Sequence, residues 1–370
     1  MDQQGFKHLV SGCRKGPVAW GLRLVLSPAG GVYSLVVRIR NFLYDKGLLK
    51  SQRAGAPVVS VGNLTVGGTG KTPLVIWLAG LLGSKGLSCG ILTRGYKMGS
   101  AGTPAIDEPA ILARECLRAR VIVNADRIAG AAEAVKLHSV EVLLLDDGFQ
   151  HRRLARDLDI VAIDATCPFG YGRVLPAGLL REPVSGLKRA HAAVITRSDQ
   201  VHKDDLAAIE DELRRRNPRL VIARTRHLPV SATDDCGHDL ELGRFSGKRV
   251  FAFSGIGNPE GFFATVRGLG CEIVATLAFD DHHHYSHNDL AYICGEALKS
   301  GAEWILTTQK DWISSPLGGF KASGSDGPTR QYALPFAFLS VRMEFTDGRD
   351  AFTSLIEQAL GDTMSDRKQP

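Results

Sequence analysis

The sequence predicts an α/β protein with a larger parallel-sheet domain and a second, smaller α/β domain. Three observations lead to this class. Short apolar runs alternate with helix-like stretches, which is typical of a parallel sheet covered on both faces. A glycine-rich turn follows the first of these runs, and strand-like runs resume after a polar stretch late in the chain. With 370 residues the chain can form two domains, each with its own core.

The apolar runs give the expected strands. In the larger domain they lie at 58–61, 90–93, 121–123, 142–145, 160–163, 192–196 and 220–223. In the smaller domain they lie at 250–254, 273–277, 304–307 and 338–341. Residues 224–248 are polar and look irregular. We therefore expect a basic helical segment over 1–44, the larger domain over 45–235, a linker over 236–248, the smaller domain over 249–345, and a helix with a polar tail over 346–370.

The glycine-rich turn lies within VVSVGNLTVGGTGKT, residues 58–72. A strand, a glycine loop and a helix N-terminus in this order bind phosphate with backbone N–H groups and the positive end of the helix dipole. Lys71 is expected to reach the β- and γ-phosphates, and the Thr72 hydroxyl a magnesium ion. The match to Walker A is imperfect at Thr65, where its first glycine belongs. The turn predicts a P-loop NTPase-like domain whose nucleotide-binding residues are Thr65, Val66, Gly67, Gly68, Thr69, Gly70, Lys71 and Thr72.

The apolar run at 142–145 ends in the carboxylates of Asp146 and Asp147. A buried strand that aims an Asp at the metal of a bound nucleotide is the Walker B arrangement. The alternative is an ordinary strand that runs into a turn. Behind a Walker A loop the metal-binding interpretation is favoured, and the turn places His151 near the same edge.

Asp107 and Glu108 precede a predicted helix. Acids favour a helix N-terminus through its dipole, which is the purely structural explanation. A carboxylate near the γ-phosphate can instead accept a hydroxyl proton or bind magnesium. Spacing alone does not decide between the two interpretations.

The densest histidine cluster has three interpretations, which the residues leave open. It can be a solvated polar loop, a metal site, or an Asp-His couple in which a carboxylate orients an imidazole. Zinc has weak support, because consecutive histidines diverge and no Cys or Glu falls at ligand spacing. The cluster consists of Asp280, Asp281, His282, His283, His284 and Tyr285, with His287 just after it.

Two further segments carry arginines. Arg94 and Tyr96 follow the second expected strand and so lie at the same sheet edge as the glycine loop. In PAGLLREP, residues 176–183, Arg181 could contact a phosphorylated substrate. A surface pair with Glu182 is the safer prediction.

The N-terminal residues are basic. Residues 1–55 hold nine Lys and Arg against two acids, a local charge of +7, whereas the whole chain carries +6. Residues 18–26 and 32–44 show apolar residues at helical spacing, separated by a break at 27–31 that contains Pro28. No run approaches the roughly 18 uncharged apolar residues of a membrane span, so an interfacial helix on anionic lipid fits better. The alternative is a helix packed on the domain with solvated arginines.

Composition and cysteine usage indicate the compartment. The chain has 44% hydrophobic and 23% charged residues, as soluble globular proteins do. Seven cysteines without a Cys-x-x-Cys pair suggest a reducing compartment. No secretory signal is evident at the N-terminus.

Together these segments resemble the tetraacyldisaccharide 4′-kinase family of lipid A biosynthesis. The resemblance runs from about residue 32 to 341 and rests on SVGNLTVGGTGKTP, LTRGY, DEPAILA, NADR, LLLDDGFQH, LPAGLLREP, FSGIGNPEGFF, DDHHHY and TTQKD, in that order. A glycine loop alone is generic, whereas this ordered set is specific. It also accounts for Thr65, since the family's loop is itself centred on GGTGKTP.

The resemblance implies a magnesium-dependent transfer of the ATP γ-phosphate to the 4′-hydroxyl of tetraacyldisaccharide 1-phosphate, which forms lipid IVA. The reaction would take place at the cytoplasmic face of a Gram-negative inner membrane, with ATP and Mg²⁺ as cofactors. The basic N-terminal helix would bring the enzyme peripherally to an anionic membrane surface and its lipid. No nucleic acid and no obligate protein partner is expected.

The resemblance also implies residue roles. The family's catalytic aspartate falls on Asp107, the expected base, and the histidine of its dyad falls on His282 in the Asp281-His282 step. With base and histidine on different domains, we expect cleft closure to complete the site. The extra Asp280 and three consecutive histidines depart from the family's pattern, so the dyad could shift to His283. The expected magnesium ligands are Thr72, Glu108, Asp146 and Asp147, and the expected substrate contacts are Arg94, Tyr96 and His151.

Two other functions share these motifs. A P-loop kinase for another small substrate would have no need of a basic amphipathic N-terminal helix. A nucleotide-dependent metallochaperone would bind stoichiometric metal at 282–287, where the lipid kinase would bind none.

Overall fold

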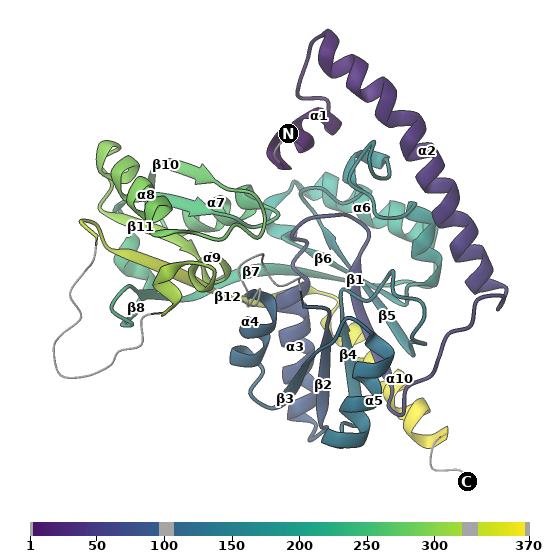
Figure 1. Cartoon of the computed structure of the whole chain (residues 1–370). Helices are drawn as coiled ribbons and strands as arrows, with labels where there is room; N and C mark the ends of the chain where they lie inside the picture. The colour runs from purple at the N-terminus through teal and green to yellow at the C-terminus, as the bar shows by residue number, and fades with distance from the viewer. Residues whose placement is uncertain (1–2, 96–106, 320–331, 367–370) are drawn as a thin grey trace. The chain divides into compact units, whose positions relative to one another are not determined.

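The computed structural model describes residues 3–95, 107–319 and 332–366. Its internal contacts divide the chain into two compact units. The first unit comprises residues 1–105, 109–226 and 345–370, and the second comprises 106–108 and 227–344. The second unit is thus inserted into the chain of the first, which is completed by the C-terminal residues (Figure 1).

The first unit is built on a parallel sheet with the strand order β7-β6-β5-β1-β4-β2-β3. Its strands are β1 (Val58–Asn63), β2 (Cys89–Thr93), β3 (Ala119–Val123), β4 (Val142–Asp146), β5 (Leu158–Asp164), β6 (Ala192–Thr196) and the first half of β7 (Val221–Asp234). Its helices are α1 (Gln3–Val10), α2 (Pro17–Asp45), α3 (Lys71–Ser84), α4 (Asp107–Glu115), α5 (Arg127–His138), α6 (Lys203–Arg216) and α10 (Arg349–Asp366), with 3-10 turns η1 (Gly170–Gly172), η2 (Val184–Arg189) and η3 (Ser198–Gln200).

Helices cover both faces of this sheet. Val58 of β1 pairs with Leu143 of β4, so both side chains face the same side, where they pack with Ala131 of α5. Further along that face, β5 and β6 pack against α6. The opposite face is covered by α3, whose Leu74 and Leu78 are fully buried. This two-sided burial explains why the strands are continuous apolar runs.

The second unit is a smaller α/β unit with the strand order β10-β9-β11-β12-β7, in which β8 pairs with β7. β9, β10, β11 and β12 pair in parallel. Aromatic rings fill its core, where Phe253 makes edge contacts with Tyr285 at 5.4 Å and Phe336 at 6.3 Å between ring centroids. Its elements are the second half of β7, β8 (Asp239–Leu240), η4 (Leu242–Phe245), β9 (Arg249–Ser254), α7 (Pro259–Arg267), β10 (Glu272–Ala278), α8 (His287–Lys299), β11 (Trp304–Thr308), α9 (Gln309–Ile313), η5 (Pro316–Gly319) and β12 (Phe336–Asp347).

Each expected strand overlaps an observed one, and the predicted α/β class with a parallel sheet is confirmed. We expected residues from 224 onward to be irregular, but β7 continues through them to Asp234. Ala223 and Thr225 are buried while Arg224 and Arg226 are half-buried. This period-two pattern is that of a strand with one more exposed face, which tolerates polar side chains.

The N-terminal segment forms one continuous helix, α2, so the expected break at 27–31 is wrong. Pro28 costs the helix a backbone hydrogen bond, and the helix contacts the rest of the first unit just beyond it. Gly30 lies so close to the loop at 174–177 that an added Cβ would be 2.8 Å from Ala177 Cβ. The Tyr33 hydroxyl donates to the Arg181 carbonyl at 2.8 Å. By length and composition, α2 is the one described helix that could cross a membrane, and only 11% of its most apolar window is buried.

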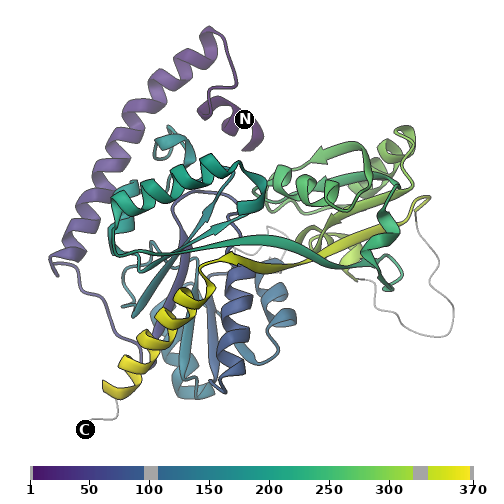
Figure 2. The same ribbon diagram turned by 180° about the vertical axis from the view of Figure 1, so that it is seen from behind.

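The C-terminal helix α10 lies beside α3, as Figure 2 shows from behind. Trp77 of α3 contacts Phe345 at 4.7 Å and Phe352 at 5.9 Å between ring centroids. Lys85 at the end of α3 pairs with Glu357. Phe345, Phe352 and Glu357 therefore pack on the helix that follows the glycine-rich loop.

Candidate functional site

The glycine-rich loop lies at the carboxyl edge of the first unit's sheet, between β1 and α3. Gly67 and Gly70 have φ values of 109° and 81°, in the left-handed region that favours glycine. α3 begins at Lys71 with no side-chain cap, so its first N–H groups are not satisfied by a side chain. Thr65 is buried and its backbone bridges to Leu180, which is a place that does not require glycine. The loop therefore has the geometry of a phosphate cradle.

Side chains at the ends of neighbouring strands hold the loop's carbonyl groups. The Thr196 hydroxyl donates to the Thr69 carbonyl at 2.9 Å, and Arg197 Nη1 donates to the Gly68 carbonyl at 3.0 Å. Arg197 also pairs with Asp164 at 2.5 Å, and both side chains are buried. Because C=O and N–H of one peptide point in opposite directions, fixing a carbonyl orients the next N–H. The sequence analysis missed these residues, although Asp164 and Thr196 stand at the ends of buried strands.

Asp147 is an anionic centre beside the loop. Its carboxylate lies 3.3 Å from Lys71 Nζ and accepts from Arg181 Nη1 at 2.7 and 2.8 Å. Burial alone would raise the pKa of Asp147, but Lys71 and Arg181 lower it to about 2. Glu182 accepts instead from Arg189 at 2.7 Å. The predicted Arg181–Glu182 surface pair is therefore wrong, because each side chain has a better-placed partner.

Asp146 is the last residue of β4, the strand next to β1, and is 5% exposed. The Thr93 hydroxyl at the end of β2 donates to Asp146 Oδ2 at 3.3 Å. The buried Arg127 donates to the Asp146 carbonyl at 3.4 Å and to the Asn124 carbonyl at 2.7 Å. The structure thus brings two strand-end carboxylates, Asp146 and Asp147, to the edge where the glycine loop begins. Carboxylate and hydroxyl oxygens are the ligand types that Mg²⁺ prefers.

Basic side chains gather near the same edge. Burial, followed by the charges of Arg127 and two other arginines, lowers the pKa of His151 to about 4. Burial lowers the pKa of Arg127, and the nearby charge of Arg94 lowers it further. Arg94 follows β2 directly and is exposed. Tyr96 lies outside the described residues. Arg94 and the buried Arg127 therefore carry the positive charge near this edge, whereas His151 is neutral at pH 7.

The second unit carries the Asp281-His282 step in the loop between β10 and α8. Lys310 Nζ lies 3.0 Å from Asp281 Oδ1 and 3.5 Å from His282 Nε2. His282 Nε2 lies 4.0 Å from Asp281 Oδ2. Burial would lower the pKa of Lys310, but the carboxylates of Asp281 and Glu108 raise it. Lys310 was not singled out in the sequence analysis, although it belongs to the TTQKD motif.

Asp107 is the first residue of α4. By their contacts Asp107 and Glu108 group with the second unit, which also contains His282. The rest of α4, from Pro109 onward, belongs to the first unit, so the expected placement of base and histidine on different domains stays a prediction.

His283 faces the core of the second unit. Its ring stacks on Phe279 at 4.6 Å and meets Tyr285 edge-on at 4.7 Å between centroids. Its Nε2 lies 3.6 Å from Asp289 Oδ2. Aromatic packing therefore occupies His283, and the geometry favours His282 as the histidine of an Asp-His pair.

A different set of metal-type ligands meets on the hairpin between β7 and β8. Asp234, Cys236 and His238 place one ligand atom each within 4.8 Å of one another. Asp234 Oδ1 accepts from the backbone N–H of Cys236 at 2.9 Å and of His238 at 2.8 Å. Its other oxygen lies 3.2 Å from His238 Nδ1. Closure of the turn accounts for this arrangement without a metal.

Comparison with known proteins agrees with this geometry. Residues 22–361 match the family described as tetraacyldisaccharide-1-P 4′-kinase. The chain is 39% identical over 315 residues to a tetraacyldisaccharide 4′-kinase of Anaeromyxobacter dehalogenans, covering 81% of this chain and 83% of that protein. It is 40% identical over 323 residues to the enzyme of the same name from Syntrophotalea carbinolica, covering 83% of this chain and 87% of that protein.

A solved structure agrees as well. The crystal structure of LpxK from Aquifex aeolicus in complex with ATP superposes with a TM-score of 0.66 at 29% identity. The superposition covers 92% of this chain and 99% of that one. These matches confirm the resemblance carried by the motifs. Because the family match covers most of its length, the chain belongs to the tetraacyldisaccharide-1-phosphate 4′-kinase family.

Proposed function

We propose that this protein transfers the γ-phosphate of ATP to the 4′-hydroxyl of tetraacyldisaccharide 1-phosphate and so forms lipid IVA. The observation that carries the proposal is the phosphate cradle before α3, with Lys71 and Asp147 beside it at the carboxyl edge of a parallel sheet. Ligands of parallel sheets bind at this edge. The positive charges of Arg94 and Arg127 near this edge suit an acceptor that carries its own phosphate.

The nucleotide side of the reaction rests on the loop of residues 65–72. The loop N–H groups and the start of α3 would hold the phosphates, and Lys71 would neutralise charge on the β- and γ-oxygens. Thr196 and Arg197 fix the loop through its carbonyls. Rigid donors need no reorganisation during the reaction, which is why such a loop can stabilise charge that develops on the transferred group.

A magnesium ion fits the donor set on this part of the protein. Asp146 would hold it with the Thr72 hydroxyl, and Asp147 and Glu108 are further candidates. Its oxygen ligands are the hard type that Mg²⁺ requires. When bound, the ion would neutralise negative charge on the ATP phosphates.

On the acceptor side, Asp107 would accept the proton of the 4′-hydroxyl. The bond from the 4′-oxygen to phosphorus forms, the bond from phosphorus to the ADP oxygen breaks, and the proton passes to the carboxylate. His282 would orient Asp107. Arg94, Tyr96 and His151 would contact the lipid headgroup.

Helix α2 would bring the enzyme to its lipid. Val18, Val25, Val32 and Val36 are 58–71% exposed, and their spacing places them on one face. A face of this kind binds a membrane surface. The substrate is itself a lipid, and the reaction uses ATP, so we place the protein peripherally on the cytoplasmic face of the bacterial inner membrane.

The test is transfer of labelled γ-phosphate from Mg-ATP to purified tetraacyldisaccharide 1-phosphate in detergent micelles, with the full-length protein. We expect a doubly phosphorylated lipid from the wild type. Lys71→Ala and Asp107→Ala should each lower its rate at least about 100-fold, because phosphate neutralisation and proton acceptance are lost. Lys85→Ala, at the far end of the same helix and 37% exposed, should remain within about twofold.

The rival functions predict different products. Label released as inorganic phosphate without labelled lipid would contradict the proposal and indicate a nucleotide hydrolase. Transfer to a small water-soluble alcohol in preference to the lipid would indicate a kinase for another substrate. A metallochaperone would retain stoichiometric metal through gel filtration.

A further inference from the structure

Lys310 is the second residue of α9, and its backbone is fixed at both sides. The Thr308 hydroxyl accepts from the N–H of Asp311 at 3.1 Å and donates to Asp311 Oδ2 at 2.6 Å, which caps the start of the helix. The Lys310 carbonyl accepts from the Ser314 hydroxyl at 3.0 Å. The backbone that carries the Lys310 side chain is therefore fixed in position.

The Asp311 carboxylate also fixes the segment around His282. Asp311 is 1% exposed and accepts from the Ser254 hydroxyl at 3.1 Å, the Gly255 N–H at 2.9 Å and the Tyr285 hydroxyl at 3.1 Å. The Gly255 carbonyl in turn accepts from the His282 N–H at 3.1 Å. Lys310 and His282 are thus held by one buried hydrogen-bond network, although 28 residues separate them in the chain.

The Lys310 ammonium meets the imidazole of His282 at a specific atom. It lies 3.5 Å from His282 Nε2 and 3.0 Å from Asp281 Oδ1, and its side chain is 16% exposed. An ammonium group has hydrogens to donate and no lone pair to accept. His282 Nε2 must therefore be the acceptor, which leaves the ring proton on Nδ1. Asp281 compensates the ammonium and keeps it charged.

We propose that Lys310 is a positioning residue that fixes the ring orientation of His282 and its Nδ1-protonated tautomer. The inference rests on the proposed function, in which His282 orients the carboxylate that accepts the hydroxyl proton. With Lys310 on Nε2, Nδ1 is the ring atom left to donate to that carboxylate, and the other tautomer would leave a lone pair there instead of a proton. His282 also adopts a left-handed backbone conformation with φ of 64°. For a residue other than glycine this conformation needs support from its surroundings.

The first test observes the tautomer without any catalysis. Long-range ¹H–¹⁵N spectra of the full-length protein, with the His282 signals assigned by their loss in His282→Ala, distinguish a protonated Nδ1 from a protonated Nε2. We expect the tautomer with the proton on Nδ1 in the wild type and a mixture of tautomers in Lys310→Met. A wild-type ring protonated on Nε2, or a Lys310→Met spectrum equal to that of the wild type, would overturn the inference.

The second test measures whether Lys310 acts through His282. Lys310→Met should lower kcat of lipid phosphorylation about 10- to 100-fold with little change in KM for either substrate, and Lys310→Arg should restore most of it. In the His282→Ala background the same substitution should change kcat less than about twofold, because residues that act through one another are not additive. An equal loss in both backgrounds would mean that Lys310 supports the fold alone.

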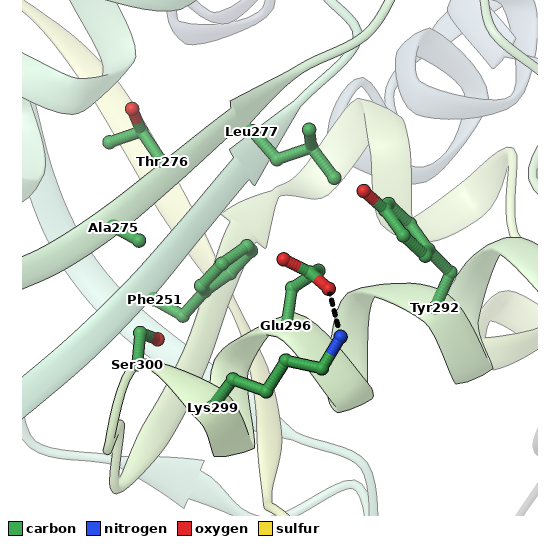
Figure 3. A pocket seen from close by; sticks show the side chains of 8 residues that line it. All are labelled: Phe251, Ala275, Thr276, Leu277, Tyr292, Glu296, Lys299 and Ser300. Carbon is green, nitrogen blue, oxygen red and sulfur yellow. Dashed lines mark hydrogen bonds and ion pairs between the residues drawn. The ribbon is translucent and has the colours of Figure 1, made fainter.

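A matched control comes from another lysine of the second unit. Lys299 pairs with Glu296 at 2.8 Å on the wall of an open hollow of about 260 Å³ (Figure 3). Lys299→Met removes a lysine from a carboxylate pair, as Lys310→Met does, but at a side chain that is 76% exposed on α8. It should leave kcat and the histidine spectrum unchanged. A protein that fails to phosphorylate lipid would refute the proposed function, while the spectra would still decide the tautomer.

Discussion

Lys71 has an anionic partner in Asp147 at 3.3 Å, and this partner competes with phosphate for the same ammonium. Asp147, with a pKa of about 2, is ionised at neutral pH. Arg181 shares the same carboxylate and so limits the hold of Asp147 on Lys71. Asp147 therefore holds the Lys71 ammonium beside the loop without neutralising its charge fully. When a nucleotide binds, the ammonium already lies close to the position in which it contacts the phosphates.

The pKa of His151 leads to a prediction about pH. Burial and nearby arginines lower it from 6.5 in a free chain to about 4 in the folded protein. Between these values the unfolded chain binds more protons than the folded one. The free energy of unfolding should therefore fall as the pH decreases from about 6.5 to about 4 and be retained in full above that window.

Urea unfolding at about pH 7 and about pH 5 measures this effect. The wild type should lose more stability than His151→Gln on acidification, by at most about 1.4 kcal/mol per pH unit. The variant removes the titrating group but keeps a side chain of similar size. Equal losses in the two proteins would mean that His151 titrates normally.

At the scale of elements, α2 has one face that packs on the first unit and another that is exposed. Gly30, Tyr33, Val37 and Arg40 follow helical spacing and face the body of the first unit, where Arg40 donates to the Gln150 carbonyl at 2.8 Å. The valine face described above is exposed. Because docking uses one face only, the apolar face remains available to a membrane surface.

The exposed face gives a prediction about membrane binding. Val25→Glu/Val36→Glu should lower the partition coefficient onto vesicles of mixed neutral and anionic phospholipid at least about tenfold, because two apolar side chains are replaced by anions. Their exposed fractions of 69% and 58% mean that the fold should not suffer. Flotation of the full-length protein with such vesicles measures the change.

A matched variant separates this face from general surface apolarity. Leu137→Glu/Leu298→Glu introduces the same charges at exposed apolar positions of α5 and α8, which are 73% and 50% exposed. It should bind vesicles as the wild type does. If both double variants lose binding equally, charge repulsion and not the α2 face is responsible.

The strands and the glycine loop could be predicted from the sequence because their signals are local. Buried parallel strands are continuous apolar runs, and the loop is a pattern of adjacent residues. Residues that act through distant partners could not be predicted in this way. Arg197 meets the Gly68 carbonyl across 129 residues, and Lys310 meets Asp281 across 29. The close contact of α2 just beyond Pro28 likewise involves Ala177, far along the chain.

At the scale of the whole molecule, the first unit depends on packing by the C-terminal helix α10. Phe352 of α10 is fully buried and contacts Trp77 of α3 and Phe345. Phe352→Ala should lower the free energy of unfolding of the first unit by about 3–5 kcal/mol through lost burial and the cavity left behind. Denaturant unfolding followed by tryptophan fluorescence measures it.

Glu357→Gln provides the comparison on the same helix. Glu357 is 48% exposed, and its pair with Lys85 lies at the surface. Loss of this pair should change the free energy of unfolding by less than about 1 kcal/mol. A similar cost for both substitutions would show that α10 is not held by its aromatic contacts.

The insertion of one unit within the other has a consequence for synthesis on the ribosome. The 118 residues of 227–344 must be translated after β7 begins and before α10 appears. At about 5–20 residues per second this takes roughly 6–24 s. During that interval the nascent P-loop unit displays the apolar surface of Trp77 that α10 later covers, while the inserted unit is an almost continuous stretch that can fold first. The unit whose first strand is made early is therefore the last to be completed.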